Sequence, residues 1–347
     1  MTSDPIARYL SQRTAKMDRR NRLRLMTGNE IIDVAIRVYQ VLGWTFLKST
    51  IVPSLFCLAS VTFFLRYVWP SYFVTKSPGS QSAQILEMVS TTGLALFVAA
   101  PLFILGVSYT QVLVANLVSD YMVGNVPSSS AADEKGRELL PKLFWLNLRE
   151  VLLACSGILV SLGLLALAAY ISSATTETDA TAGIVVLFAW LGFAAGGIFF
   201  LAVVVRHSLA PVIMALEGKS IGEAAKRSVS LLKTYGMHSG GYSAVTSVMA
   251  LLLLLWMLIG GGISISIQLI GLPDLLRSGV SGLPFSSVFI EALGLLPTFL
   301  VMWTLTPVWA ATTTIIYYDR RIRLEGYDIE ALAEDVWRAD RSRRFEL

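Results

Sequence analysis

The sequence LAPVIMALEGKSIGEAAKRSVSLLKTYG, residues 209–236, joins the end of a very apolar segment to a turn and a short helix. Glu217-Gly218 is the predicted turn, because glycine readily adopts the left-handed conformation that ends many helices. Ser220 and Glu223 then have the spacing of a capping box, in which each side chain binds the other residue's free amide. This segment predicts a helix that starts after Ser220 and ends at Gly236.

The two faces of this predicted helix differ in polarity. At helical spacing one face carries Ile221, Ala224, Ala225, Ser228, Leu231, Leu232 and Tyr235. The opposite face carries Glu223, Lys226, Arg227 and Lys233. A helix of this kind lies in the headgroup layer of a membrane or packs under a helix bundle.

The rest of the chain is unusually apolar. Of its 347 residues, 54% are apolar and 15% are charged, whereas soluble domains have about 25% charged residues. A helix that spans a bilayer needs about 20 apolar residues. Uncharged runs long enough for this occupy residues 88–119, 151–172, 180–205, 239–273 and 292–318. The composition therefore predicts an all-α polytopic membrane protein.

Six transmembrane helices fit the pattern. They are predicted at about residues 46–68, 88–117, 151–171, 182–205, 242–270 and 285–317. The segments on one side of these helices hold 25 of the 28 Lys and Arg residues. Basic segments stay in the cytoplasm, and the charged N-terminal region lacks the apolar core of a secretory signal. We therefore expect a multi-pass plasma-membrane protein with both termini in the cytoplasm.

Three similar units follow one another along the chain. Capping-box patterns start at Thr27, Ser130 and Ser220, and each precedes an amphipathic segment and a helical hairpin. The predicted repeats cover about residues 27–125, 126–218 and 219–325, within a membrane domain at 27–338 that follows a basic cytoplasmic arm at 1–26 and precedes a charged tail at 339–347.

A few polar and helix-bending residues lie within the predicted spans. Glu291, Thr298 and Thr306 form a candidate intramembrane polar site, although Glu291 lies near the outer end of its helix and threonine hydroxyls often bind their own helix. Helix kinks are predicted at Pro101, Gly261, Pro297 and Pro307. Gly192 and Gly196 form a GxxxG pattern, which favours close helix packing within the chain over dimerisation.

No pattern of catalytic or metal-binding residues is recognisable. The two histidines, His207 and His238, lie at predicted membrane boundaries without metal-ligand spacing. Cys57 and Cys155 fall in apolar segments, where a free cysteine behaves as a small hydrophobic residue. The sequence therefore predicts no enzyme activity, no cofactor and no metal. The basic residues follow one membrane face, which predicts topology and no nucleic-acid partner.

Two motifs resemble a known family. IIDVAIRVY at residues 31–39 and IIYYDRRIRLEGYDIE at 315–330, together with residues 209–228, are similar to motifs of bacterial six-helix membrane proteins. These proteins are related to the membrane domain attached to some glycerophosphodiester phosphodiesterases. The resemblance covers about residues 27–332 and implies the six-helix fold in a bacterial inner membrane. The phosphodiesterase domain itself has no counterpart here, and the basic arm departs from the family pattern.

The distinctive charged residues lie on the predicted cytoplasmic side. We therefore expect a non-enzymatic scaffold or assembly partner, embedded in the lipid bilayer, that docks a membrane or cytoplasmic protein through residues 220–235 and 327–337. The candidate docking residues are Glu223, Lys226, Arg227, Lys233, Asp319, Arg320 and Arg321. The alternative is a transporter or permease subunit for a lipid-like or small solute, which the predicted kinks and Glu291 would serve.

Overall fold

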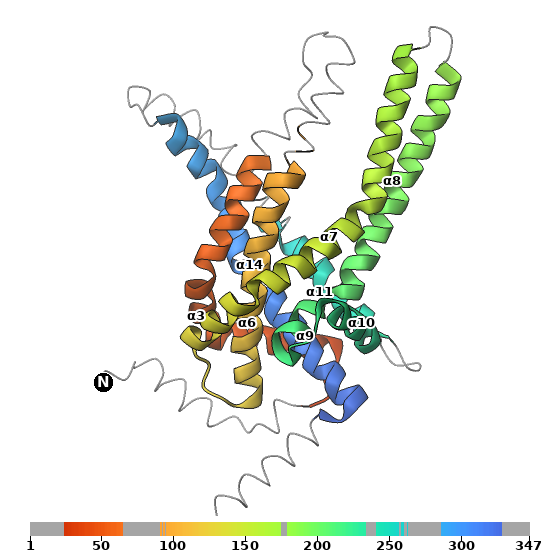
Figure 1. Cartoon of the computed structure of the whole chain (residues 1–347). Coiled ribbons are helices and arrows are strands. Elements are labelled where there is room, and N and C mark those ends of the chain that lie inside the picture. The colour runs from red at the N-terminus through yellow and green to blue at the C-terminus, as the bar shows by residue number, and fades with distance from the viewer. Residues whose placement is uncertain are drawn as a thin grey trace, which may run out of the picture.

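The computed structural model describes residues 24–64, 91, 93, 95–174, 179–233, 241–256, 258–259, 262 and 286–327. Within these residues the regular structure is helical throughout (Figure 1). The elements are α3 (Gly28–Phe63), η2 (Ala95–Ala99), α6 (Ala100–Val123), α7 (Ser129–Ala174), α8 (Asp179–His207), α9 (Ala210–Glu217), α10 (Ile221–Leu232), α11 (Gly241–Trp256) and α14 (Ser286–Glu325). The all-α prediction is confirmed for this part of the chain.

In the part of the chain that the structure describes, five helical segments are long and apolar enough to cross a membrane. They are Gly28–Phe63, Phe97–Val123, Ser129–Leu164, Leu187–Glu217 and Leu295–Glu325. The fifth predicted span, at residues 242–270, is described only as the 16 residues of α11 and a few isolated positions. The sixth membrane helix therefore stays a prediction. So do the arm before Arg24, the docking segment beyond Tyr327, and the tail, which lie outside the described residues.

The predicted cytoplasmic segments and the predicted spans join differently from the prediction in the first two predicted units. α3 and α7 are single helices of 36 and 46 residues, so each amphipathic segment runs directly into the following span. Neither junction contains a proline or a pair of glycines that would stop the helix. α10, in contrast, ends at Leu232, earlier than the predicted stop at Gly236, and Lys233 already has an extended backbone with ψ 135°.

Two of the three predicted capping boxes are present. Thr27 with Glu30 starts α3, and Ser220 with Glu223 starts α10. The prediction of a box at Ser130 is wrong, because α7 begins at Ser129, two residues before the start that such a box requires. Ser128 caps this helix through its hydroxyl, which accepts from the Ala131 amide at 3.4 Å. Asp133 is therefore available to bind Tyr109 and Arg137 instead.

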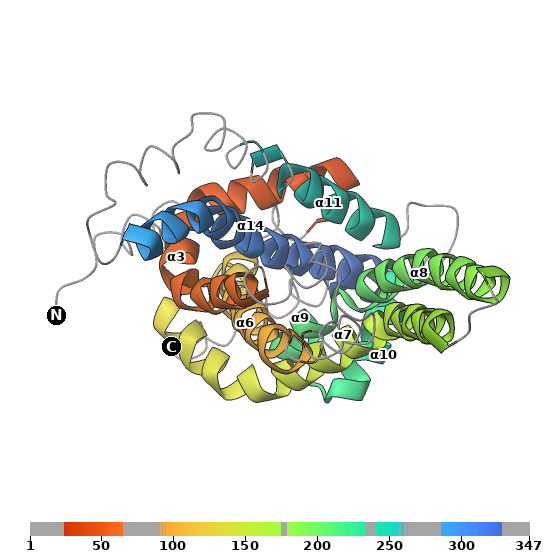
Figure 2. The same ribbon diagram turned by 90° about the horizontal axis from the view of Figure 1, so that it is seen from above.

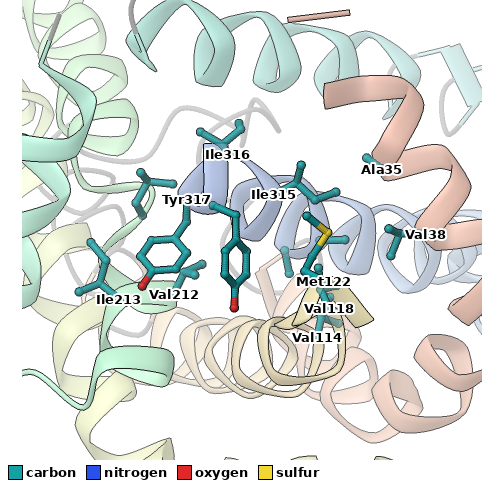
Figure 3. Packing of buried hydrophobic residues seen from close by; sticks show 14 of the residues in the cluster. Ala35, Val38, Val114, Val118, Met122, Val212, Ile213, Ile315, Ile316 and Tyr317 are labelled. Carbon is teal, nitrogen blue, oxygen red and sulfur yellow. The ribbon is translucent and has the colours of Figure 1, made fainter. Parts of the chain in front are cut away.

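A single hydrophobic core lies at the lower end of the molecule as drawn in Figure 1. Seen from above, α14 crosses the middle, with α11 on one side and α6, α7 and α9 on the other (Figure 2). In Figure 3, Tyr317 of α14 points toward Val212 and Ile213 of α9, while Ile315 lies near Met122 of α6. The turn-and-helix segment at residues 209–232 thus packs into the centre of the core, since Ala210–Ala215 are all buried.

Helices α7 and α8 form a hairpin whose upper part stands apart from α3 and α6 (Figure 1). Large apolar side chains on this hairpin, such as Phe188, Trp190 and Ile198, are exposed, as expected for a surface that faces lipid. The two helices touch through small residues. A Cβ atom on Gly196 would lie 2.8 Å from the Gly157 carbonyl carbon, and one on Gly192 would lie 2.7 Å from Ser161 Oγ. The GxxxG face therefore packs within the chain.

We predict opposite effects for alanine at two neighbouring glycines of α8. Gly196→Ala should destabilise the protein by about 1–3 kcal/mol, because the new methyl group would press on the α7 backbone. Gly197→Ala is the matched control, since nothing lies within 4 Å of its Cβ position. Helix propensity alone should make that variant neutral or more stable. Thermal unfolding in mild detergent measures the stability of both variants. Equal melting temperatures would contradict the close packing at Gly196.

Candidate functional site

Asp319, in the last part of α14, is the most deeply buried charged group at the lower end of the molecule. Its side chain is 1% exposed, and its Oδ1 accepts the Met26 amide at 2.9 Å. Its Oδ2 accepts from Arg323 Nε at 2.9 Å, and Arg323 also donates to the Met26 carbonyl. Arg320 lies beside it, buried, with its Nε 3.9 Å from Oδ2. These bonds fasten the residues before α3 to the end of α14.

A second cluster joins α9, α10 and α14 around Glu217. The Tyr317 hydroxyl donates to the Glu217 carboxylate at 3.0 Å. Lys219 Nζ and Arg227 Nε lie 3.3 and 3.4 Å from its other oxygen. Arg321 Nη1 in turn donates to the Tyr317 hydroxyl at 3.2 Å. The carboxylate that ends α9 is thus held by three side chains from two other parts of the chain.

Glu325 completes the polar layer at the end of α14. It accepts from Arg321 Nε at 3.0 Å and contacts the guanidinium of Arg227. The Arg321 guanidinium lies 4.2 Å from the ring centre of Tyr327, a cation–π arrangement. Arg227 and Arg321 therefore both bind other side chains of the same protein.

The predicted docking residues consequently fall into two groups. Asp319 and Arg320 are buried, and Arg227 and Arg321 hold elements together, so these four serve the fold in this conformation. Glu223 and Lys226 of α10 are exposed, and so is Lys233, directly after the helix. Sequence reasoning does not separate the two groups, because all seven residues lie in similarly charged stretches.

The exposed carboxylate of Glu223 also caps its own helix. The Ser220 hydroxyl donates to it at 2.7 Å and the Ser220 amide at 3.1 Å. These two bonds stabilise the ionised form and hold the pKa of Glu223 below its usual value.

The predicted intramembrane polar site is only partly described. The Thr306 hydroxyl donates to the Met302 carbonyl of its own helix at 2.7 Å, as do Thr312, Thr313 and Thr314 to carbonyls one turn earlier. Threonine hydroxyls commonly bind their own helix in this way, which is the alternative to a role in the predicted polar site. The side chains of Glu291 and Thr298 lie outside the described set.

The residues predicted to kink helices lie in different structural surroundings. α14 continues as one helix through Pro297 and Pro307. Pro101 lies in the first turn of α6, directly after the π-helical turn η2, so its missing amide falls at a change of helix type. Gly261 lies outside the described residues.

A cavity of about 200 Å³ lies where α6, α7, α8 and α14 meet, and it was not predicted from the sequence. Its walls are mostly apolar, with Phe103, Phe200 and Trp309 among them. Two ionisable side chains line it, Glu150 of α7 and His207 at the end of α8. The Glu150 Oε1 and His207 Nδ1 atoms lie 3.7 Å apart. Both atoms are buried and neither has a hydrogen-bond partner.

An amide group completes the polar part of the cavity wall. Asn147 Nδ2 donates to Ser108 Oγ at 2.8 Å and to Gln111 Oε1 at 2.9 Å. These bonds fix Asn147 and Gln111 across α6 and α7 and leave the Gln111 NH₂ group as a further donor. His207 alone was noted from the sequence, as a boundary residue. Its neighbour Glu150 was not identified as a site residue, because helical periodicity does not indicate which helices become neighbours.

Among the residues that the structure describes, no three His, Cys, Asp or Glu side chains gather closely enough to hold a metal ion. Comparison of the chain with protein-family models, curated proteins and solved structures finds no match. The family resemblance of the motifs at residues 31–39 and 315–330 therefore stays a prediction.

We predict that Asp319→Ala loosens the start of α3. The variant leaves the exposed Arg323 without its carboxylate and the buried Met26 amide without its acceptor, a loss of about 1–3 kcal/mol. Hydrogen exchange should show faster exchange of the Met26 amide, with a lower melting temperature. Glu134→Ala is the control, because Glu134 is an exposed carboxylate near the start of α7. Unchanged exchange at Met26 would contradict the role of Asp319.

The capping box of α10 predicts a pH dependence. Since the folded pKa of Glu223 lies below its unfolded value of about 4.3, its stabilisation is complete at neutral pH. It is lost as the pH falls through the folded pKa. Hydrogen-exchange protection at the start of α10 should therefore drop in acid. Glu223→Gln should show lower protection at pH 7 and no such step, and a step of wild-type size in this variant would exclude Glu223 as its source.

Proposed function

We propose that this chain is a non-enzymatic protein of the bacterial inner membrane, with both termini in the cytoplasm, that acts as a scaffold or assembly partner. Five apolar helices support the membrane location. The concentration of Lys and Arg on one side supports the orientation. The observation that carries the proposal is the outer face of α10.

We define the α10 surface as Glu223, Lys226, Ser230 and Lys233, which are all exposed. The other face of the helix is buried in the core through Ala224, Ala225, Ser228, Leu231 and Leu232. The α10 surface carries two positive charges and one negative charge. A partner of complementary chemistry therefore presents acidic side chains, which such a surface attracts over a distance.

Contacts with neighbouring elements hold the α10 surface in place. Arg227 connects α10 to Glu217 and to Glu325 of α14. The Ser228 hydroxyl donates to the Arg206 carbonyl of α8 at 2.9 Å. Because these contacts hold the helix before any partner arrives, little conformational entropy is lost on docking.

Charge reversal at Lys226 and Lys233 tests this proposal. Arg227 is excluded from the test because it serves the fold. The double variant Lys226→Glu/Lys233→Glu should weaken association with a co-purifying protein at least about tenfold, which is the expected cost of turning two attractions into repulsions. Affinity purification in mild detergent, with cross-linking mass spectrometry on α10, measures the partner and its attachment point.

Lys135→Glu/Lys142→Glu is the matched control. It makes the same change of charge at two exposed lysines of α7. Equal recovery of the partner with wild type and both double variants would overturn docking on α10. Equal melting temperatures of the three proteins would show that the fold is intact.

A transporter or permease subunit for a lipid-like or small solute is the second candidate. The cavity that Glu150 and His207 line favours it, because ionisable groups near the membrane mark solute and proton pathways. Uptake into proteoliposomes of compounds that occupy the cavity tests it. Transport that survives Glu291→Gln and fails in Glu150→Gln would assign the coupling group to the cavity.

A further inference from the structure

The Glu150 and His207 side chains face each other across the cavity without touching. Their Oε1 and Nδ1 atoms are 3.7 Å apart, whereas an N–H···O hydrogen bond is about 2.7–3.2 Å long. Both atoms are inaccessible to solvent and lack another partner. Buried polar atoms are nearly always bonded, so this pair has the geometry of two atoms that share a third group.

One oxygen atom that lies beside the pair can reach both atoms. A hydroxyl group placed about 2.8 Å from each atom would donate to the Glu150 carboxylate and accept from the Nδ1–H of His207. An ionised carboxylate on the ligand would instead offer Glu150 no donor, and an ammonium group would offer the histidine no acceptor. The pair therefore selects a group that is both donor and acceptor.

The remainder of the cavity selects an apolar body. Its walls include Phe103, Val107, Val151, Phe200 and Trp309. Its volume of about 200 Å³ exceeds the roughly 30 Å³ share of one water molecule several-fold. Apart from Glu150 and His207, every side chain of the lining is uncharged, so the rest of the ligand must be uncharged as well.

We propose that this cavity binds a neutral, membrane-soluble molecule with an apolar body and a free hydroxyl, which bridges Glu150 and His207. The site is separate from the α10 surface, and binding holds whether or not the ligand is transported. Gln111 lies in the same wall and provides an additional donor for a second oxygen on the ligand.

The position of the cavity indicates how such a molecule enters. It lies where the α7–α8 hairpin diverges from α6 and α14 (Figure 1). Phe103 of its lining is 38% exposed and belongs to a helix that is long and apolar enough to cross a membrane. The ligand is therefore either a lipid with a free hydroxyl or a free alcohol dissolved in the membrane.

Photolabelling with a diazirine derivative of 1-octanol tests the proposal on the full chain in nanodiscs. Labelled residues, identified by mass spectrometry, should include residues of the cavity wall. An excess of 1-octanol should suppress this labelling, whereas n-octane at equal membrane concentration should be about tenfold less effective, as expected for loss of a hydrogen bond. Suppression by 1,2-dioctanoylglycerol and not by its acetylated form would identify a lipid as the source. Suppression by 1-octanol alone would identify a free alcohol.

Three variants test the residues. Glu150→Leu removes the acceptor and should reduce the advantage of octanol over octane about tenfold. Glu138→Leu is the matched control at an exposed position of the same helix. Ala154→Phe, at a buried position of the cavity wall, fills the space and should abolish labelling there even if Glu150→Leu fails to fold. Octane that competes as well as octanol, or cavity labelling that survives Ala154→Phe, would overturn the proposal.

Discussion

The buried carboxylate of Asp319 is the constraint on which the lower end of the molecule depends. A carboxylate in a protein interior is tolerated only when its oxygens are bonded. Here they bind the Met26 amide and Arg323, and Arg323 returns to the Met26 carbonyl. The start of the first described helix is thereby fixed to the end of the last one, 293 residues away.

A second set of polar contacts starts at Arg321 of the same helix. Arg321 binds Tyr317, which binds Glu217 at the end of α9. An isolated helix of eight residues is unstable in water, so α9 depends on this bond and on its burial between α6 and α14. α10 follows directly after Gly218, which has a φ of 66°. The position of α9 thus decides which face of α10 is left exposed.

The α7–α8 hairpin obeys a different constraint. Its helices approach closely at Gly157, Ser161, Gly192 and Gly196, where larger side chains would collide. Farther down, the same two helices bring Glu150 and His207 together against α6. The upper part of the hairpin is closely packed, and its base borders a cavity. The exposed apolar faces of the hairpin need only lipid beside them, and no further helix.

Much of the local structure could be predicted from the sequence. Gly218 ends α9 because glycine adopts the left-handed backbone conformation without help from any other residue. The capping boxes at Thr27 and Ser220 each depend on two residues that are three positions apart. The apolar runs are long enough for membrane helices by length alone. The start of α7 was misplaced because several adjacent serines offer the same hydroxyl, and Asp133 prefers Tyr109 and Arg137.

The sequence by itself determined the helical class, the apolar segments and the helix caps, since each depends on side-chain periodicity or on contacts within one turn. Only the tertiary structure decided which charges are buried. Asp319 and Arg320 occupy the interior while Lys226 and Lys233 remain on the surface. It also decided that Glu150 faces His207. Helical periodicity defines the faces of each helix, but the free energy of burying charges and filling space selects the neighbouring helix that each face meets.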